Sequence, residues 1–380
     1  SEVIAGYWKH AAQKLAANPA AAATFLLNGR TPRAGEMIRL PDLARTFETI
    51  ARHGADAFYR GEIAQAITQH VQQNGGLLTL ADLADHTSTW VAPISVDYRG
   101  VRIYEMPPNG QGLAALLALN MLQGDDLAAL GHNTADYLHL MIEVMKLGFA
   151  DAYRFVADPD IAPAPLATLL SPKHAHKQRA MVNMHHAAPG PLFDYGSDTV
   201  YLTVVDRNRN AVSFINSLYM GFGSGVVVPG TGVCLQNRGA LFSLNPNHAN
   251  ALAPHKRPYH TIIPARATKE GKLFMSFGVM GGFMQPQGHV QVVANVVDFG
   301  MDPQQALDQP RWRYDDGYKV AIEAGFPAET YAALLARGHD VQVTADGVGF
   351  GGGQIIMVHP HSGVLMGGSE PRKDGCAVGY

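Results

Sequence analysis

A threonine at the head of a predicted strand is the residue of this sequence best placed to do chemistry. Thr199 follows Asp198 and opens a β-branched run that ends at Asp206, directly after an irregular segment, residues 184–191, rich in His, Pro and Gly. Cleavage of the peptide bond before Thr199 would leave a hydroxyl and a free α-amine on one residue. An α-amine has a pKa of about 8, so it can accept the hydroxyl proton at neutral pH without a histidine. The alternative is a structural threonine, which is the commoner role of this residue in a strand.

A pair of glycines supplies candidate groups for binding negative charge. Gly281 and Gly282 follow a predicted strand, and their backbone N–H groups suit the oxyanion of a tetrahedral intermediate, where one lost donor costs about 3 kcal/mol. The alternative is a bulge or tight turn. Two further glycine clusters, residues 221–225 and 349–353, are followed by strand-like residues instead of a helix, which argues against a dinucleotide site.

Histidines are the remaining candidates for chemistry. His174, His176, His185 and His186 lack a third ligand at the spacing typical of zinc motifs, so we expect no metal site and no cofactor. The methionines of residues 138–149 recur at helical spacing and indicate core packing.

Composition excludes several classes of protein. The chain has 380 residues, 47% of them hydrophobic, and a formal net charge of -3, which is enough apolar sequence for a large core. Its basic residues are scattered, so we expect no nucleic-acid partner. No stretch approaches the roughly 18 consecutive apolar residues of a membrane span, so we expect no membrane partner. The chain has two cysteines, Cys234 and Cys376, which could form at most one disulfide bridge. They do not decide whether the compartment is cytoplasmic or periplasmic.

The elements that must position these residues change in type near residue 183. Upstream, the pattern predicts helices with one hairpin, and downstream of Thr199 it predicts mainly strands. The expected strands are 91–97, 101–105, 199–206, 211–217, 273–277, 340–344, 354–359 and 363–366. The expected helices are 2–15, one from Pro41, one between Gly61 and Asn74, 134–155, about 287–299 and about 327–337, with a short cap turn at Thr79 and another at 303–309. Helices outside sheets fit a layered α+β fold.

Several motifs together resemble the γ-glutamyltranspeptidase family. They are the run from Thr199, Asn210-Ala211-Val212, Lys256-Arg257-Pro258, Gly281-Gly282 and the terminal Gly379-Tyr380. The resemblance covers the whole chain and implies a four-layer αββα sandwich of the N-terminal-nucleophile hydrolase type. It also implies cleavage between Asp198 and Thr199, which would divide a large-subunit segment, 1–198 with a linker at 183–198, from a small-subunit segment, 199–380. Relative to the family, we expect that roughly the first third of the precursor is absent.

The resemblance also assigns site residues. It implies that Thr199 is the nucleophile, that Gly281 and Gly282 hold the oxyanion, and that Ser217 orients the nucleophile from the next strand. Tyr219 stands where the family has an Asn that assists Ser217.

The substrate-binding positions depart from the family pattern. Leu241 replaces the Asp that binds a glutamyl α-ammonium, and His260-Thr261 replace two serines that help to hold the α-carboxylate. Thr261 can still donate a hydrogen bond, whereas His260 is either a core histidine or a group facing the ligand. Arg238 is a new charge that could bind a carboxylate or form a salt bridge within the protein.

Three functions are compatible with these residues. The first is a γ-glutamyltransferase or glutathione hydrolase-like amidohydrolase that passes an acyl group through Thr199 to water or an amine. The second is a glutaryl or cephalosporin acylase, whose acyl group carries no α-ammonium and so needs no Asp at position 241. The third is a catalytically silent homologue that only binds. In the first two, the expected partners are a small γ-glutamyl or acyl-amide substrate and the two subunits of one precursor.

Overall fold

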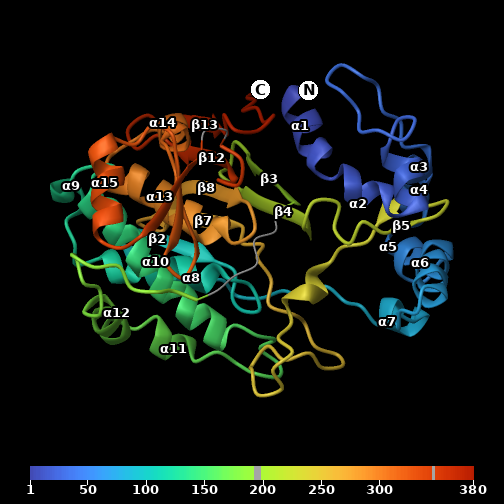
Figure 1. Cartoon of the computed structure of the whole chain (residues 1–380), viewed down its shortest axis with the longest axis horizontal. Helices are drawn as coiled ribbons and strands as arrows, with labels where there is room; N and C mark the ends of the chain where they lie inside the picture. Colours follow the sequence, from blue (N-terminus) through green and yellow to red (C-terminus); the bar gives the residue numbers. More distant parts are fainter. Residues whose placement is uncertain (192–197, 345–346) are drawn as a thin grey trace. The chain divides into compact units, whose positions relative to one another are not determined.

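Two groups of elements make up the chain in this computed structural model (Figure 1). The structure describes residues 1–191, 198–344 and 347–380, so residues 192–197 of the predicted linker lie outside the described residues. One unit comprises residues 1–90 and 218–237, and the other comprises residues 91–217 and 238–380. The two units are described separately below.

The smaller unit is mainly helical. Its elements are α1 (Glu2–His10), α2 (Ala12–Ala16), α3 (Pro19–Phe25), α4 (Pro41–His53), α5 (Ala55–Tyr59), α6 (Glu62–Gln73), α7 (Leu80–Ala84), β5 (Val227–Val228) and β6 (Val233–Cys234). Pro41 occupies the first turn of α4, and Thr79 caps α7 through a capping box with Asp82, as the sequence predicts. The single helix predicted over residues 2–15 is wrong, because the chain turns at Ala11 and only α2 buries a side chain, Leu15.

The larger unit contains most of the strands. Its helices are α8 (Gly112–Leu122), α9 (Leu127–Leu130), α10 (Ala135–Phe155), α11 (Leu166–Leu169), α12 (Pro172–Arg179), the 3-10 helix η1 (Arg238–Leu241), α13 (Met284–Val297), α14 (Pro303–Asp308) and α15 (Ala328–Ala336). Its strands are β1 (Ile94–Tyr98), β2 (Val101–Glu105), β3 (Asp198–Val205), β7 (Ala265–Lys269), β8 (Lys272–Met280), β9 (Trp312–Asp316), β10 (Lys319–Glu323), β11 (Asp340–Thr344), β12 (Gly352–Val358) and β13 (Leu365–Ser369), and β4 (Ala211–Tyr219) ends two residues into the smaller unit.

A six-stranded antiparallel sheet is the centre of the larger unit. Its order is β1-β2-β7-β8-β12-β13, while β11-β10-β9 and β3-β4 form separate sheets. The sheet therefore joins strands from both sides of Thr199, because β1 and β2 precede that residue and the other four strands follow it.

Strand β8 has packing partners on both of its faces. Side chains of a strand alternate between faces. On one face, Ser276 and Gly278 contact β3, and on the other Phe277 and Val279 contact α13. A helical layer that includes α8, α10 and α13, the six-stranded sheet and the β3-β4 sheet are thus stacked in that order. The described part of the larger unit is a layered α+β structure, as expected.

Some strands escape the sequence patterns for identifiable reasons. Strand β7 reads Ala-Arg-Ala-Thr-Lys, which has little intrinsic β-propensity, yet it pairs on both sides with β2 and β8. Strands β9 and β10 were also not predicted. The strand expected from Val91 begins only at Ile94, since Pro93 has no N–H to donate to a ladder.

Two negative observations bear on the earlier expectations. Neither Cys234 nor Cys376 takes part in a disulfide bridge in the part of the chain that the structure describes. Among the residues that the structure describes, no helix combines the length and apolar character needed to cross a membrane.

The close contact of α8 with α10 gives a testable prediction. A Cβ added to Gly148 would lie 2.8 Å from the carbonyl oxygen of Ala114, which is backbone and cannot move aside freely. We expect Gly148→Ala to lower the melting temperature, because overpacking of about 1 to 3 kcal/mol exceeds a helix-propensity gain of about 1 kcal/mol.

The matched control is Gly6→Ala in α1, where no atom lies within 4 Å of the added Cβ. This exposed helical glycine should tolerate alanine with an equal or higher melting temperature, measured by circular dichroism. A Gly148→Ala protein that melts at or above the wild-type temperature would contradict the packing argument.

Candidate active site

Thr199 begins the site because its hydroxyl already has an oriented partner. It is the second residue of β3 and only 5% exposed, and its Oγ1 donates a hydrogen bond of 2.9 Å to Oγ of Ser217 on β4. The strand alternation that buries Thr199 and Tyr201 leaves Val200 and Leu202 exposed.

The stacking of β3 on β8 indicates where Thr199 lies along the larger sheet. Thr203 Oγ1 donates to Ser276 Oγ at 2.6 Å, and the ring of Tyr201 covers Gly278, where a Cβ would approach it to 2.5 Å. The two strands therefore run in opposite directions across this contact, so that a residue two positions earlier in β3 faces a residue two positions later in β8. Continued by one step, this register would bring Thr199 toward Met280, the residue before the glycine pair.

The glycine pair turns the chain from β8 into α13. Gly281 and Gly282 have φ angles of +140° and +60°, and their carbonyls accept the N–H groups of Met284 and Gln285. The N–H groups of the pair therefore lie at the start of a helix, where the helix dipole favours negative charge. A Cβ at Gly281 would lie 2.9 Å from Cα of Gly351, so the glycine cluster 349–353 packs against the glycine pair.

Gln111 links the glycine pair to the predicted substrate-binding residues, and sequence analysis missed it. Its fully buried Nε2 donates to the carbonyls of Gly282 at 2.8 Å and Thr261 at 2.9 Å, and its Oε1 accepts from Tyr259 Oη. The only signal in the sequence is its place before the apolar helix α8, directly after a Pro- and Gly-containing turn.

Sequence analysis also missed a pair of side chains, His289 and Glu105, that supports β8 from the helical layer. His289 accepts the backbone N–H of Val279 at Nε2, so its Nδ1 carries the proton that is donated to Glu105 Oε1 at 2.6 Å. Burial raises the pKa of the Glu105 carboxyl. Both side chains are buried, and together they hold the strand that leads into Gly281.

The structure brings three of the four predicted substrate-binding residues together. Arg238 Nη1 donates to the hydroxyl of Thr261 at 3.2 Å, and His260 precedes that buried threonine. A Cβ at Gly110 would meet Cε1 of His260 at 2.9 Å, which shows how closely the ring is packed.

The fourth of these residues, Tyr219, and Leu241, which replaces the family Asp, have different surroundings. Tyr219 ends β4 with a φ of +81° and a buried ring, and its contacts assign it to the smaller unit. Leu241 ends η1 and packs against the apolar core of the larger unit.

His260 is held in its neutral form. Although the residue is partly exposed, its Nδ1 is shielded from solvent and has no hydrogen-bond partner among the described residues. Burial of the ring, together with the positive charges of Arg238 and Arg257, lowers the pKa of His260 to about 3.

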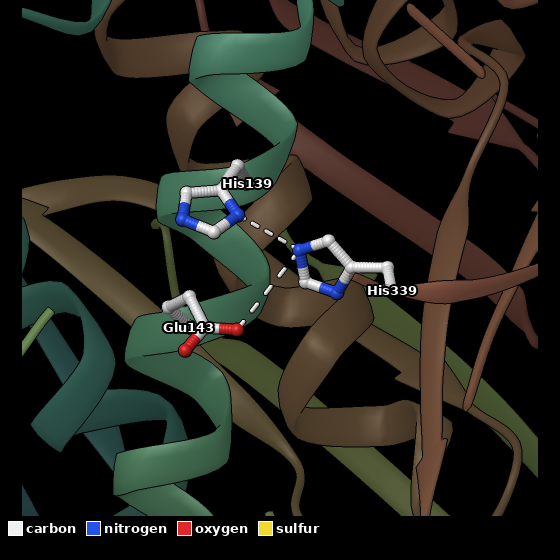
Figure 2. Close-up of side chains that lie close together, drawn as sticks. All are labelled: His139, Glu143 and His339. Atoms are coloured by element: carbon white, nitrogen blue, oxygen red, sulfur yellow. Dashed lines mark hydrogen bonds and ion pairs between the residues drawn. The ribbon is translucent and has the colours of Figure 1, made fainter. Parts of the chain in front are cut away.

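The histidines considered as metal ligands do not cluster with one another. His174 hydrogen-bonds Asp151 at 2.6 Å, whereas His185 and His186 belong to the linker. Within the described ranges, one group brings three possible ligand atoms within 4.8 Å of one another, namely His139, Glu143 and His339 (Figure 2). Sequence analysis missed it because His339 is 200 residues from His139.

Comparison with known proteins agrees with this architecture. The family model described as Gamma-glutamyltranspeptidase matches residues 1–380. A glutathione hydrolase-like YwrD proenzyme of Bacillus subtilis (strain 168) is 40% identical over 370 residues, which are 96% of this chain and 70% of that protein. An oxamate amidohydrolase proenzyme of Klebsiella pneumoniae is 35% identical, with 97% of this chain and 70% of that protein covered.

A solved structure extends the similarity to the whole fold. The cephalosporin acylase from Bacillus halodurans superimposes with a TM-score of 0.94 at 47% identity, covering 100% of this chain and 71% of that one. Fold and relatives together define the class, which is that of the N-terminal-nucleophile hydrolases. Within it, the chain belongs to the γ-glutamyltranspeptidase family, whose members named above are amidohydrolases, acylases and glutathione hydrolases, several of them proenzymes.

The neutral state of His260 predicts how stability depends on pH. The unfolded chain takes up a proton on this residue below a pH of about 6.5, whereas the folded chain does so only near pH 3. The folded protein should therefore lose stability as the pH falls from about 6.5 toward 3, since protons bind preferentially to the unfolded state. His260→Asn should lose less stability over this range, as measured by urea unfolding midpoints at pH 7.5, 6, 5 and 4. Parallel losses in the two proteins would show that His260 does not contribute.

Proposed function

We propose that this chain is an amidohydrolase that cleaves itself before Thr199 and then transfers acyl groups through the Thr199 hydroxyl to water or an amine. The observation that carries the proposal is the hydrogen bond of 2.9 Å from Thr199 to Ser217. It lies at the start of β3, the strand whose Tyr201 packs on Gly278 of β8, and β8 leads into Gly281. A hydroxyl with an oriented partner, beside backbone donors at a helix start, suits attack on a carbonyl.

Self-cleavage would begin with attack of Thr199 Oγ1 on the carbonyl carbon of Asp198. The C–N bond breaks, the nitrogen takes up the proton of the Thr199 hydroxyl and becomes the new α-amine, and an ester joins Asp198 to Thr199. Water then hydrolyses this ester, which releases the Asp198 carboxylate and restores the hydroxyl. The products are segments 1–198 and 199–380, and each segment contains residues of both units. Together the two segments would form the expected αββα sandwich.

The mature site would use the same atoms on an external amide. The α-amine of Thr199 takes the hydroxyl proton, the oxygen attacks the substrate carbonyl, and the N–H groups of Gly281 and Gly282 stabilise the oxyanion. The amine product leaves with that proton, and water or another amine resolves the ester. Ser217 orients the nucleophile, and the chemistry requires no cofactor or metal.

The acyl group that fits best carries a carboxylate at one end. Arg238 and Thr261 lie together and offer a cation and a hydroxyl, to which Tyr219 and His260 are the remaining candidate contacts. A γ-glutamyl group also carries an α-ammonium, and the apolar Leu241 would leave it without an anion. This observation favours the second candidate, an acylase acting on glutaryl-type amides, and the similar solved structure described above is named a cephalosporin acylase.

Replacement of the nucleophile tests the mechanism. Thr199→Ala should give a full-length and inactive protein, because it removes the group that attacks both Asp198 and the substrate. Thr199→Ser should be processed slowly and keep weak activity, since it retains a hydroxyl. Intact mass of the purified full-length protein reads out processing, and release of a γ-glutamyl or glutaryl anilide reads out activity.

The control is Val204→Ala, a β-branched residue of the same strand whose side chain is exposed. It should be cut between Asp198 and Thr199 as the wild type is. Fragments of native mass from Thr199→Ala would refute the assignment, and a wild type that is never cut and cleaves neither anilide would identify a silent homologue.

Position 241 tests the choice of acyl group. Leu241→Asp should raise the ratio of kcat/KM for the γ-glutamyl over the glutaryl anilide by about tenfold or more, because a charge-assisted contact contributes about 1.5 to 3 kcal/mol. Leu241→Asn is the matched control, since it is similar in size to Asp but uncharged, and it should leave the ratio near the wild-type value. An unchanged ratio in folded Leu241→Asp would show that other residues recognise the acyl group.

A further inference from the structure

One face of α10 carries three polar side chains that the proposed chemistry does not use. His139, Glu143 and Lys146 follow one another at intervals of four and three residues, so they share a face of the helix. Their exposed fractions are 0%, 3% and 3%, and Lys146 Nζ lies 2.7 Å from Glu143 Oε1. His139 Nδ1 lies 2.8 Å from Nε2 of His339, which reaches the cluster from the turn before β11 (Figure 2).

The hydrogen bonds of this cluster argue against its use as a metal site. Nε2 of His139 faces the carbonyl oxygen of Asn183 at 2.8 Å, so that nitrogen carries the proton of the neutral ring and Nδ1 accepts from His339. Burial lowers the pKa of both imidazoles, in agreement with neutral rings. Both oxygens of Glu143 also have donors, and a divalent cation would lie beside the ammonium of Lys146.

All three α10 side chains instead hold the backbone of the segment that precedes the proposed cleavage point. His139 bonds the carbonyl of Asn183, Lys146 Nζ donates to the carbonyl of Ala188 at 2.6 Å, and Glu143 Oε2 accepts the N–H of Ala188 at 3.1 Å. Both backbone groups of Ala188 are therefore satisfied by one buried ion pair.

Further contacts fix the same segment beyond Ala188. The N–H of Ala187 donates to the carbonyl of Arg337 at 2.7 Å, that of Gly190 donates to Gly317 at 2.9 Å, and Tyr314 Oη donates to the carbonyl of Pro191. The seat at Gly190 is tight, since a Cβ there would lie 2.5 Å from Tyr314 Oη and 2.9 Å from Cγ of Lys146. Residues 183–191 are thus held at several points.

The cost of burying the ion pair points to a role beyond stability. Apolar side chains of similar volume would often stabilise a core as well as a buried pair does. What they could not do is bind the N–H and the carbonyl of Ala188, a surface residue whose backbone lies against the pair. The pair therefore specifies the path of this segment.

We propose that His139, Glu143 and Lys146 are positioning residues for self-cleavage, which hold residues 183–191 so that the Asp198 carbonyl is presented to Thr199. This inference rests on the proposed function. Thr199 follows Pro191 by eight positions, so the chain between them can span at most about 28 Å. The contacts that hold residues 183–191, which we call the anchor, therefore limit where the peptide bond between Asp198 and Thr199 can lie.

Loss of all the contacts that hold residues 183–191 would move the last fixed point of the chain back to Val182, whose N–H bonds the carbonyl of Arg179 at the end of α12. The stretch between the last fixed point and Thr199 would then grow from about seven to about sixteen residues, which lowers the probability of a productive approach about threefold. Loss of orientation adds to this factor.

Two variants test the anchor, one on α10 and one in the segment that α10 holds. Lys146→Met removes the ammonium, and Gly190→Ala places a methyl group against Tyr314 Oη and Cγ of Lys146 while keeping both charges of the ion pair. Gly124→Ala is the matched control, since no atom lies within 4 Å of its added Cβ, and Lys146→Arg tests rescue by the conservative change. Freshly synthesised full-length precursor is followed by intact mass for its processing half-time, and the cleaved fraction is assayed for kcat and KM.

We expect Lys146→Met and Gly190→Ala, each of which disturbs part of these contacts, to lengthen the half-time toward the roughly threefold effect of losing them all, with wild-type kcat and KM once cleaved. Gly124→Ala should match the wild type, and Lys146→Arg should process faster than Lys146→Met. Processing at the wild-type rate in Gly190→Ala would overturn the proposal, as would a fall in kcat parallel to the slower processing. If Lys146→Met does not fold, Gly190→Ala decides alone. If the wild type itself is not cut before Thr199, the proposed function fails first, which is a distinguishable result.

Discussion

The stacking of β3 on β8 is the contact on which the candidate site depends. It requires small residues on one face of β8, because the ring of Tyr201 occupies the space above Gly278 and Thr203 bonds Ser276. The register of that contact runs from the start of β3 toward the end of β8, the strand that leads into the turn before α13. The proposed nucleophile and the proposed backbone donors would therefore be positioned by one interaction between two sheets.

Buried amide side chains then hold the backbone around this contact. Gln111 bridges the carbonyls of Gly282 and Thr261, and in α13 Gln287 and Gln291 bond the N–H and the carbonyl of Tyr314 and Trp312. An amide offers both a donor and an acceptor without charge, so it can satisfy a strand edge inside the core at lower cost than an ion pair. This helps to explain why α13 is buried along almost its whole length although it is rich in Gln.

The sequence predicts local features of this molecule better than the contacts between distant ones. The cap at Thr79, the helix over 134–155 and the strand 101–105 follow from local signals and are confirmed. Strand β7 could not be predicted, because its order comes from its neighbours and not from its residues. Thr199 and Ser217 could be singled out by resemblance, whereas Gln111 and the His139 cluster depend on partners more than 100 residues away, which no single motif reveals. The roles of the site residues stay predictions.

The antiparallel pairing of β2 with β7 has a consequence for the protein after a cut at residue 198. The ladder from Val101 to Tyr104 would join two separate polypeptides, and strands from both would share one sheet and one apolar core. Neither polypeptide could bury its apolar surface alone, so dilution would not separate them and only denaturation would. The cut protein should thus behave as an obligate heterodimer whose interface is a domain interior, formed by folding first and division afterwards.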